Sequence, residues 1–463
     1  MEPVTLQSIA EASGGVLYPP DAASLVVRGL CTDSRRLQAG ELFVALRGER
    51  FDGHDFLKEP GLKQASAVVV CAQRAGEVPA GMPAITVADT RAALGRIAGA
   101  HRRRFSLPVF CVAGSNGKTT TKELLAALLE TQFPTLRSQA SFNNDIGVPL
   151  SLLGLDASHR AAVLEAGTNH PGELAPLIDL IAPRFGLVPQ IGREHLEHFG
   201  SLEGVVDEES ALGRALPPEG ILFLNGDCEA ARPLASRTRA RVIRTGFEPG
   251  NDWRATILET GWNATRFEVT APAPEWCGVF DLGVPGRHMV SNALLALAAA
   301  AELHIRPEAA RGALARFCGA KQRLQWSELH GIRWLDDTYN ANTDSTLASL
   351  QTLSELPCTG RRVAVLGDMA ELGEHTDAAH REVGAAARRL GIDLLVCIGR
   401  SAAQTAEGAQ GLSEVLSFPD VEQAIPALRP RIRPGDCILA KASRSSRLER
   451  LFETLKTQPL ENH

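Results

Sequence analysis

Apolar and polar positions alternate along the chain in blocks that predict strands followed by helices. The clearest block is residues 108–132, PVFCVAGSNGKTTTKELLAALLETQ, where an apolar run from Val109 to Ala113 meets a glycine turn. Beyond the turn, leucines recur at helical spacing from Leu124 to Leu129. The block therefore predicts a buried strand, a tight turn and an amphipathic helix.

The same alternation continues on both sides of this block. Further strands are predicted in the apolar runs at 41–46, 65–72, 161–167, 185–191 and 221–227, with helices at 89–105 and 284–303. A second alternation begins in the stretches 331–342, 361–373, 393–399 and 436–451. Strands that alternate with helices indicate parallel sheets covered on both faces. In such sheets, ligands gather at the carboxyl ends of the strands.

The length of 463 residues exceeds what one hydrophobic core usually supports. The pattern restarts near residues 89 and 319, so we predict three α/β domains. These are a small N-terminal α/β domain (1–88), a central P-loop-type parallel-sheet domain (89–318) and a C-terminal Rossmann-like α/β domain (319–463).

Composition and charge narrow the class of protein. With 44% apolar and 22% charged residues the chain is globular, and a net charge of −6 argues against a broad nucleic-acid footprint. The cluster HRRR at 101–104 is interpreted as a solvated helix end. The longest apolar run, 293–301, is under half of the ~20 residues that a membrane span needs, and the N-terminus lacks the pattern of an export signal. We expect a cytoplasmic protein.

The glycine turn has the chemistry of a phosphate site. Gly114, Ser115, Asn116 and Gly117 precede Lys118, Thr119 and Thr120 at the start of the predicted helix. A helix N-terminus offers unpaired N–H groups, the lysine adds positive charge, and a threonine hydroxyl can bind magnesium. The match is GxxGKT, because Val112 stands where the usual loop has its first glycine. The alternative is an ordinary strand-to-helix turn.

Two further residues lie near predicted strand ends in the central region. Glu165 closes the strand at 161–167, and His195 follows the strand at 185–191. A carboxylate and an imidazole there could bind a metal beside the phosphates. A capping carboxylate and a structural histidine are the alternatives.

Polar clusters also occur in the outer domains. Thr32, Asp33, Ser34, Arg35 and Arg47 suit phosphate or carboxylate recognition, although a surface loop is equally consistent with them. The turn from Lys441 to Arg447 could hold a carboxylate or could be a solvated helix start. The turn LGDMAELG lacks GxGxxG spacing, which removes the main support for a dehydrogenase.

Taken together, the motifs resemble the Mur ligase family over nearly the whole chain. They are TDSR, LFVALRGERFDGHDF, GSNGKTT, FNNDIGVP, NHPGEL, HLEHFGS, PGRH, DDTYNAN, GDMAELGE and KASRS. RGERFDGHDF and NNDIGVP favour the member that adds D-alanyl-D-alanine to UDP-N-acetylmuramoyl-tripeptide in peptidoglycan synthesis over members that add single amino acids.

The resemblance implies an ATP- and Mg²⁺-dependent ligase that phosphorylates a carboxylate and joins it to an amine. Its partners would be these small-molecule substrates, with no nucleic acid and no membrane span, and we expect a monomer. The rivals are another amide ligase of this fold, such as the third-residue-adding enzyme or folylpolyglutamate synthase, a regulatory P-loop NTPase, and a noncatalytic binder of UDP-sugars.

The resemblance also assigns roles to residues. Those implied for ATP are Gly114 to Thr120 with Asn292, Arg323, Asp337 and Tyr339; those for magnesium are Thr119, Glu165 and His195; and Lys118, His195 and Glu209 are implied in catalysis. Those implied for substrates are Thr32, Asp33, Ser34, Arg35, Arg47, Asn144, Thr168, Asn169, Asn340, Lys441, Ser443 and Arg444.

One departure from the family pattern leads to a hypothesis. The family usually has a carbamylated lysine in the helix after HLExFGS, where this chain has Glu209. We expect Glu209 to supply directly the carboxylate that carbamylation would otherwise create. Pro189, Gln190, Met289 and Ala442 also depart from the pattern, around the adenine contacts and the dipeptide loop.

Overall fold

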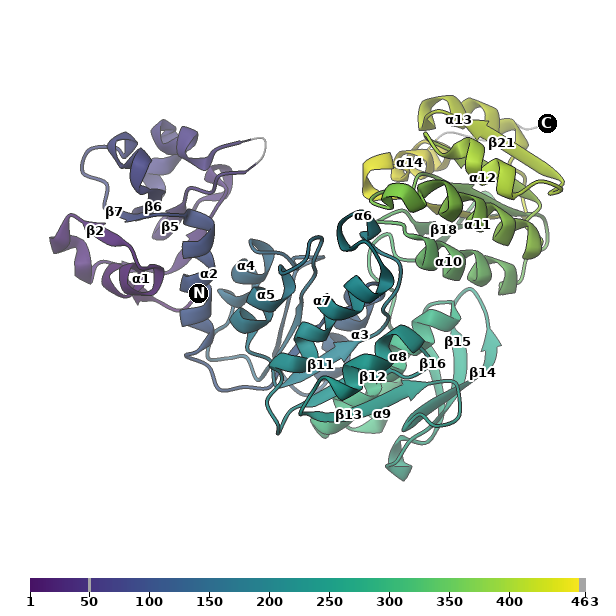
Figure 1. The fold of residues 1–463 in the computed structure, drawn as a ribbon, viewed down its shortest axis with the longest axis horizontal. Coiled ribbons are helices and arrows are strands. Elements are labelled where there is room, and N and C mark those ends of the chain that lie inside the picture. The colour runs from purple at the N-terminus through teal and green to yellow at the C-terminus, as the bar shows by residue number, and fades with distance from the viewer. Residues whose placement is uncertain (49–50, 458–463) are drawn as a thin grey trace. The chain divides into compact units, whose positions relative to one another are not determined.

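The computed structural model describes residues 1–48 and 51–457, and the chain divides into two compact units. Unit 1 comprises Met1–Cys111, Phe133–Thr168 and Ala175–Pro183; unit 2 comprises Val112–Gln132, Asn169–Leu174 and Arg184–His463. The elements are labelled in Figure 1. Residues 49 and 50, inside the motif LFVALRGERFDGHDF, lie outside the described residues.

Unit 1 begins with a five-stranded sheet in the order β2-β7-β6-β5-β4. Its strands are β2 (Val16–Tyr18), β4 (Gly29–Cys31), β5 (Glu41–Val44), β6 (Ala67–Cys71) and β7 (Ala84–Val87). Strands β4 to β7 are parallel, whereas β2 is antiparallel to β7. The predicted runs at 41–46 and 65–72 form the central strands β5 and β6, with Phe43 and Val68 in the core.

The other elements of unit 1 lie around this sheet and around a parallel strand pair. They are β1 (Val4–Thr5), β3 (Val26–Val27), β9 (Thr135–Arg137), β10 (Ala161–Glu165), α1 (Leu6–Ser13), α2 (Thr90–Arg102) and α4 (Gly147–Leu152). Strands β9 and β10 are parallel, and β1 pairs with β3 in antiparallel fashion. The predicted helix at 89–105 is confirmed as α2, which begins after Asp89 because its side chain caps two backbone N–H groups.

The interpretation of HRRR as a solvated helix end is wrong for its first two residues. His101 and Arg102 are buried. Arg102 donates to the carbonyls of Ile181 (2.9 Å) and Ala182 (3.1 Å), at the end of α5 (Leu174–Ile181). The last carbonyls of a helix have no partner within the helix, so a buried guanidinium can satisfy them. Charge alone did not reveal this partner.

Unit 2 contains six strands of a sheet in the order β16-β15-β14-β13-β12-β11. They are β11 (Phe185–Val188), β12 (Ile221–Asn225), β13 (Arg241–Gly246), β14 (Trp253–Thr260), β15 (Thr265–Thr270) and β16 (Gly278–Leu282). Strands β11 to β14 are parallel, as the alternation predicts, but β14, β15 and β16 form an antiparallel meander.

The meander was not predicted, although its sequence carries the signal. Buried and exposed residues alternate along β15, whereas every residue of β12 is buried. A period of two is typical of antiparallel strands with one solvated face, and continuous burial is typical of parallel strands covered on both sides. The fold is α/β with mixed sheets.

The predicted strand, turn and helix around the glycine loop are confirmed. They form β8 (Val109–Val112) and α3 (Lys118–Leu129), and the end of β8 lies beside β11 through a hydrogen bond from Ala113 N to Leu187 O of 3.0 Å. The remaining helices of this region are α6 (Leu196–Phe199), α7 (Leu202–Ala215), α8 (Arg287–Glu302) and α9 (Pro307–Ala315). Helices α3 and α8 pack against each other.

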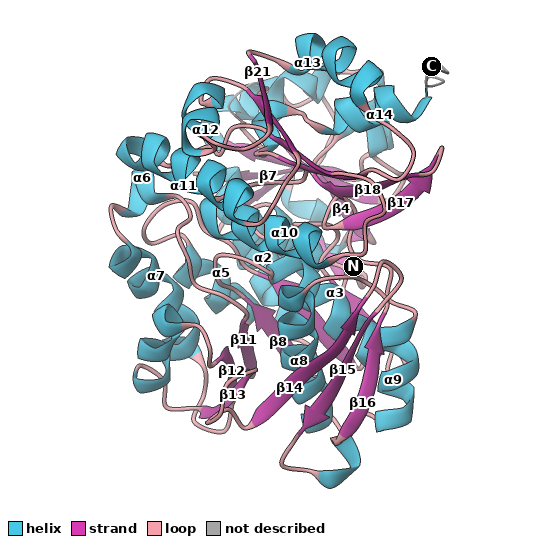
Figure 2. Ribbon diagram, turned by 90° about the vertical axis from the view of Figure 1, so that its right-hand side faces the viewer, coloured by secondary structure: helices cyan, strands magenta, loops and turns pink. Residues whose placement is uncertain are grey.

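The C-terminal region of unit 2 is built on a six-stranded sheet in the order β17-β18-β22-β19-β20-β21 (Figure 2). The strands are β17 (Gln325–Leu329), β18 (Ile332–Asp337), β19 (Arg362–Leu366), β20 (Leu394–Ile398), β21 (Glu414–Phe418) and β22 (Cys437–Lys441). All pairs are parallel except β17 with β18.

Helices cover this sheet. They are α10 (Thr343–Glu355), α11 (Thr376–Arg389), α12 (Ala402–Gly408), α13 (Val421–Leu428) and α14 (Glu449–Thr457). Side chains of α13 and α14 share one hydrophobic core with Trp334 and Val363 of the sheet. Helix α10 packs against β22, and its N-terminus follows shortly after the carboxyl end of β18 at Asp337.

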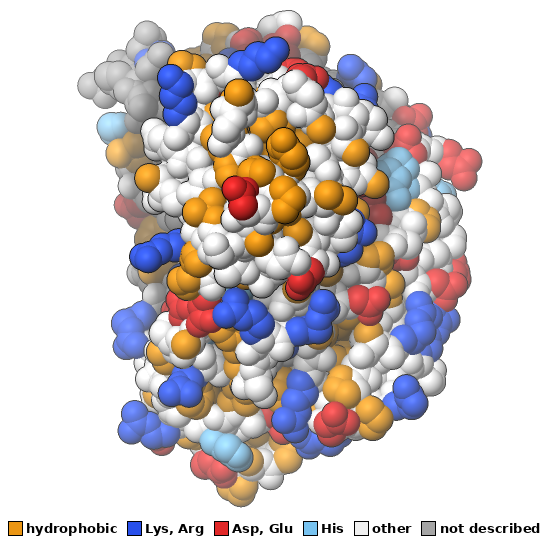
Figure 3. All heavy atoms as spheres, turned by 90° about the vertical axis from the view of Figure 1, so that its left-hand side faces the viewer, with side chains coloured by type: hydrophobic (Ala, Val, Ile, Leu, Met, Phe, Trp, Pro, Cys, Tyr) orange, Lys and Arg blue, Asp and Glu red, His pale blue; other side chains and the backbone are white. Residues whose placement is uncertain are grey.

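Basic and acidic side chains are interspersed on the face of the molecule in Figure 3. The mixture matches the modest net charge and gives this face no continuous basic area. Within the described residues, none of the helices has both the length and the apolar character required to cross a bilayer.

Candidate active site

The glycine turn is held in a shape that only glycine fits at two positions. Gly114 has φ +110° and Gly117 has φ +86°. A Cβ on Gly114 would lie 2.7 Å from the carbonyl oxygen of Gln190, and one on Gly117 would lie 2.6 Å from Oδ1 of Asn292. Glycine is therefore required at both positions for the backbone to fold this closely. The turn leads directly into the N-terminus of α3, where no side chain caps the helix, and such a terminus can serve as a seat for an anion.

Lys118 is folded back onto the turn. Its ammonium donates to the carbonyls of Gly114 and of Ser115 (3.2 Å), and it lies 3.7 Å from Oε2 of Glu194. The positive charge is therefore at the anion seat, as the spacing predicts. Thr119 and Thr120 follow it and are buried.

A buried carboxyl group on α7 lies close to this charge. Glu209 is 1% exposed, and neither of its carboxylate oxygens has a hydrogen-bond partner among the described residues. Burial raises the pKa of Glu209 to about 8; the Lys118 charge opposes the shift and the Glu194 charge adds to it. An unpartnered buried carboxylate is costly, and a cation bound beside it would relieve that cost.

His195 lies on the loop between β11 and α6. Its backbone is left-handed (φ +48°), its Nε2 is 3.9 Å from Oε2 of Glu194, and its Nδ1 forms an ion pair with Glu371. The close contact with His195, together with the charges of nearby histidines, lowers the pKa of Glu371. Glu194 and Glu371 were not predicted, because neither lies in a motif with recognisable metal or phosphate spacing.

Glu165 ends β10 in unit 1, whereas Thr119, His195 and Glu209 belong to unit 2. Glu165 is buried, its Oε1 accepts from Nδ2 of Asn143 (2.8 Å), and its N–H donates to Oγ of Ser138 (3.1 Å). Its position at a strand end agrees with the sequence pattern.

A cavity of about 500 Å³ in unit 2 brings together most of the residues implied for ATP. It is lined by Asn116, Gly117, Thr120, Asn292, Arg323 and Asp337. Tyr339 lies under Arg323, whose guanidinium is 4.0 Å from the centre of its ring. Residues from the glycine turn, α8 and the C-terminal region thus meet at one cavity although they are far apart in the sequence.

Lys441 lines this cavity too, although it was assigned to the dipeptide. It is 2% exposed, and its ammonium donates to Oδ2 of Asp337 (2.6 Å) and to the carbonyl of Asn340 (3.0 Å). Burial lowers the pKa of Lys441 while Asp337 opposes the shift. The other residues of its turn point elsewhere: Ser443 donates to the carbonyl of Ala341 (3.1 Å), and Arg444 pairs with Glu449 (3.1 Å).

Several cavity residues were missed by sequence reasoning. Gln190 and Asn225 lie together, with Asn225 Nδ2 donating to Gln190 Oε1 at 3.3 Å. Arg287 lies over the ring of Phe247 at 3.7 Å, and burial lowers the pKa of His288 to about 4. The motif PGRH and the strand end ILFLNGD contain three of these five residues, so their polar ends were an available signal.

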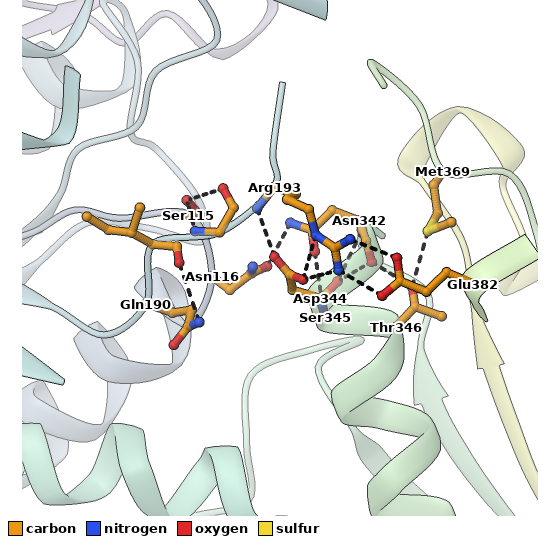
Figure 4. Close-up of polar contacts among 12 residues, drawn as sticks. Ser115, Asn116, Gln190, Arg193, Asn342, Asp344, Ser345, Thr346, Met369 and Glu382 are labelled. Atoms are coloured by element: carbon orange, nitrogen blue, oxygen red, sulfur yellow. Dashed lines mark hydrogen bonds and ion pairs between the residues drawn. The ribbon is translucent and has the colours of Figure 1, made fainter. Parts of the chain in front are cut away.

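Polar contacts join the glycine turn to the C-terminal region (Figure 4). Arg193 donates to Asp344 (2.7 Å) and to Glu382 (2.7 Å), and its pKa is raised chiefly by the hydrogen bond to Glu382. Nδ2 of Asn342 donates to Oδ1 of Asn116 at 2.9 Å. Arg193 and Asn116 thereby fasten the start of α10 to both loops that carry the candidate site.

The candidate substrate residues of unit 1 are arranged locally. Arg35 donates twice to Asp33, at 2.8 Å each, and lowers the pKa of Asp33 to about 2. Thr32 adjoins this pair, Ser34 donates to Glu59 (3.2 Å), and Arg47 forms a backbone bridge with Asp52.

The residues implied for the acceptor lie in the segments that precede α4 and α5. Asn144 Oδ1 accepts from Gly147 N at 2.8 Å and so supports the start of α4. Thr168 ends a segment of unit 1, and Asn169 begins a segment of unit 2, where its N–H donates to Glu173 (2.9 Å).

Comparison with known proteins decides the family. Residues 26–102 match the Mur ligase family catalytic domain, 112–300 the Mur ligase middle domain, and 322–444 the Mur ligase glutamate ligase domain. The UDP-N-acetylmuramoyl-tripeptide–D-alanyl-D-alanine ligase of Escherichia coli K12 is 36% identical over 98% of both chains. The chain belongs to the Mur ligase family.

Solved Mur ligase structures share the fold. The crystal structure of MurF from Acinetobacter baumannii superposes with a TM-score of 0.90 at 30% identity, covering 99% of this chain and 100% of that chain. MurF ligase from Thermotoga maritima, solved in complex with ADP, gives a TM-score of 0.80 at 27% identity over 93% and 97% of the chains. The predicted Mur ligase resemblance and the α/β fold class are confirmed; the domain boundaries stay a prediction.

Proposed function

We propose that this Mur ligase uses ATP to join D-alanyl-D-alanine to the terminal carboxylate of UDP-N-acetylmuramoyl-tripeptide. The observation that carries the proposal is the cavity, where Asn116, Gly117 and Thr120 of the glycine turn meet Asn292, Arg323 and Asp337. Relatives that align over 98% of the chain bear the name of that activity. The proposal includes a monomeric enzyme that acts in the cytoplasm.

The chemistry follows from the site. The tripeptide carboxylate attacks the γ-phosphorus of ATP. The bond between that phosphorus and the β,γ-bridging oxygen breaks, and an acyl phosphate and ADP form. The dipeptide amine then attacks the acyl carbon, phosphate leaves, and the ammonium loses its proton. Phosphoryl transfer depends mainly on alignment and charge neutralisation. We assign that work to the N–H groups at the start of α3 and to Lys118.

The residues present are suited to magnesium. Within residues 1–48 and 51–457, no three His, Cys, Asp or Glu side chains form a metal site on their own. Magnesium in nucleotide enzymes is commonly held by one or two carboxylates together with phosphate oxygens and water, and the unpartnered Glu209 carboxylate suits that role. Thr119, His195 and Glu209 would hold it. When bound, it would neutralise phosphate charge.

The remaining roles are assigned by motif. Thr32 to Arg35 and Arg47 would contact the UDP end of the acceptor, and Asn144, Thr168 and Asn169 its peptide. Asn340, Ser443 and Arg444 would contact the dipeptide. We assign Lys441 to the nucleotide cavity, in view of its pairing with Asp337 there.

The test is phosphate release from ATP with defined pairs of acceptor and amine. We expect release only when UDP-N-acetylmuramoyl-tripeptide and D-alanyl-D-alanine are both present, and loss of it in Lys118→Ala. Release with a single amino acid would identify another amide ligase of this fold, and release without amine a regulatory NTPase. An active Lys118→Ala protein would support a noncatalytic binder and overturn the proposal.

Glu209 has its own test. If its carboxylate takes the place of a carbamylated lysine, activity will not depend on bicarbonate, and Glu209→Ala will be inactive at every bicarbonate concentration. Glu208→Ala is a suitable neighbour control, because Glu208 accepts from the backbone of Gly172 and Leu174 away from Lys118. A fully active Glu209→Ala enzyme would refute the assignment.

A further inference from the structure

Two residues with unusual backbones face each other beside the candidate site. His195 has φ +48° and Glu371 has φ +61°, in a region that side chains other than glycine rarely adopt. Their side chains form an ion pair through Nδ1 of His195, and the carbonyl of Glu371 accepts from Glu197 N at 3.2 Å. Such conformations persist only where surrounding contacts enforce them, and they cluster at functional sites.

The turn that carries Glu371 is held on both sides. The N–H of Met369 donates to Nε2 of His380 (3.1 Å), and the N–H of Ala370 donates to Oγ of Ser443 (2.8 Å). On the other side, a Cβ on Gly373 would lie 3.3 Å from Cα of Glu197, so the turn lies closely against α6. The carboxylate of Glu371 is therefore presented to His195 from a fixed backbone.

The loop that carries His195 is held as well. Arg193, two residues before it, is bound to Asp344 at the start of α10 and to Glu382 within α11 (Figure 4). A Cβ on Gly192 would lie 2.4 Å from Oδ2 of Asp344, which shows how closely the two segments approach. The C-terminal region thus orients both the backbone and the imidazole of this loop.

We propose that Glu371 is a positioning residue that fixes the imidazole of His195 for phosphoryl transfer. This inference rests on the role proposed above for His195. The carboxylate forms an ion pair with Nδ1 and so favours the ring form that has its proton on Nδ1, which leaves Nε2 as the nitrogen without a proton. Nε2 lies 3.9 Å from Oε2 of Glu194, which is itself 3.7 Å from the ammonium of Lys118. From there Nε2 would be available as a ligand for magnesium. Carboxylates that orient a metal-binding histidine in this way typically change metal affinity or activity 10- to 100-fold.

The proposal also gives a physical link between the two substrate sites. Ser443, implied for the dipeptide, holds Ala370, the neighbour of Glu371. Binding of the dipeptide at the turn that contains Ser443 would therefore shift Ala370 and, with it, the ion pair between Glu371 and His195. If the ion pair between Glu371 and His195 only held the two segments together, its loss would not change the affinity for metal. The two possibilities can therefore be distinguished by measurement.

The decisive variant is Glu371→Gly in the full chain. Glycine removes the carboxylate and adopts a positive φ without strain, so the melting temperature should not fall. We expect the Mg²⁺ concentration for half-maximal activity to rise about 10- to 100-fold. Mn²⁺ binding in the presence of ADP, followed by electron paramagnetic resonance, should weaken by a similar factor. In ¹⁵N-histidine spectra the wild-type His195 signals should show protonated Nδ1, and the variant should lose this preference.

Controls separate the outcomes. Glu371→Gln keeps an acceptor oxygen and should fall between wild type and Glu371→Gly. Glu374→Ala removes a carboxylate three residues away whose side chain is 89% exposed and should match wild type. If His195→Ala is impaired while Glu371→Gly keeps its Mg²⁺ and Mn²⁺ dependence, the positioning role is wrong and the proposed function stands. If His195→Ala is itself unimpaired, the role of His195 fails as well.

Discussion

Gly114→Ala is the sharpest test of how the glycine turn is held. Two costs are expected. An alanine at φ +110° is strained by about 1–2 kcal/mol. Its Cβ would also lie 2.7 Å from the carbonyl oxygen of Gln190, a backbone atom that cannot rotate away. Overpacking of this kind costs typically about 1–3 kcal/mol, so the total loss should be about 2–5 kcal/mol.

Gly250→Ala is the matched control. Gly250 has φ +98°, and a Cβ there would meet no atom within 4 Å. It should therefore show only the strain of about 1–2 kcal/mol. Replacing glycine by alanine also restricts the unfolded chain, which raises the free energy of unfolding by the same amount in both variants. This contribution cancels when the two variants are compared. The excess loss in Gly114→Ala, about 1–3 kcal/mol, isolates the contact with Gln190.

Urea unfolding followed by tryptophan fluorescence suits this comparison. All five tryptophans lie in unit 2, and so do both glycines. The signal therefore reports the unit that contains the substitutions. Equal losses in the two variants would show that the turn moves away from Gln190 at little cost, and would refute the close fit proposed for the anion seat.

Three other predictions concern charged groups of unit 2. Asp337→Asn leaves the buried Lys441 ammonium without its carboxylate and should cost about 3–5 kcal/mol in urea unfolding, most of which Lys441→Met should restore in the double variant. His288 has a folded pKa of about 4, so it stays neutral as the pH is lowered from 6.5 to 4, whereas the unfolded chain binds a proton there. The free energy of unfolding of the wild type should therefore fall by up to about 3 kcal/mol as the pH is lowered over that range. His288→Asn should lack this fall in pH-dependent unfolding; an unchanged pH profile would contradict it. Arg193→Met should lower stability by about 1 kcal/mol at low salt and less in 1 M NaCl, measured as melting temperature, because Arg193 is partly exposed.

Local signals made the glycine turn predictable. The strand, the two glycines and the helix that starts at Lys118 depend on residues within one short segment, and the structure has them where the pattern indicates. The same holds for α2, whose start is set by the Asp89 cap. The local pattern predicts these elements, although the atoms that crowd the two glycines come from Gln190 and Asn292, which lie far away in sequence.

Partners far apart in sequence were not predictable in this way. Lys441 was interpreted from its own turn, but Asp337, 104 residues earlier, decides its position. The carbonyls that bury Arg102 are about 80 residues away. Gln190 reaches the cavity from the loop after β11, and Arg287 reaches it from the start of α8. The cavity depends on how distant elements pack, and single-sequence patterns do not contain that information.

The amide of Asn116 occupies a special place in this arrangement. Its oxygen is engaged by Asn342, the residue that caps α10, whereas its buried nitrogen has no hydrogen-bond partner among the described residues. An acceptor that enters the cavity can satisfy that nitrogen and hold Asn116 still, which strengthens its grip on the helix cap. By reciprocity, whatever anchors the first turn of α10 must tighten the hold on that acceptor by the same factor. The affinity of the cavity for its ligand and the stability of the contact between Asn116 and the α10 cap are therefore coupled through this one side chain.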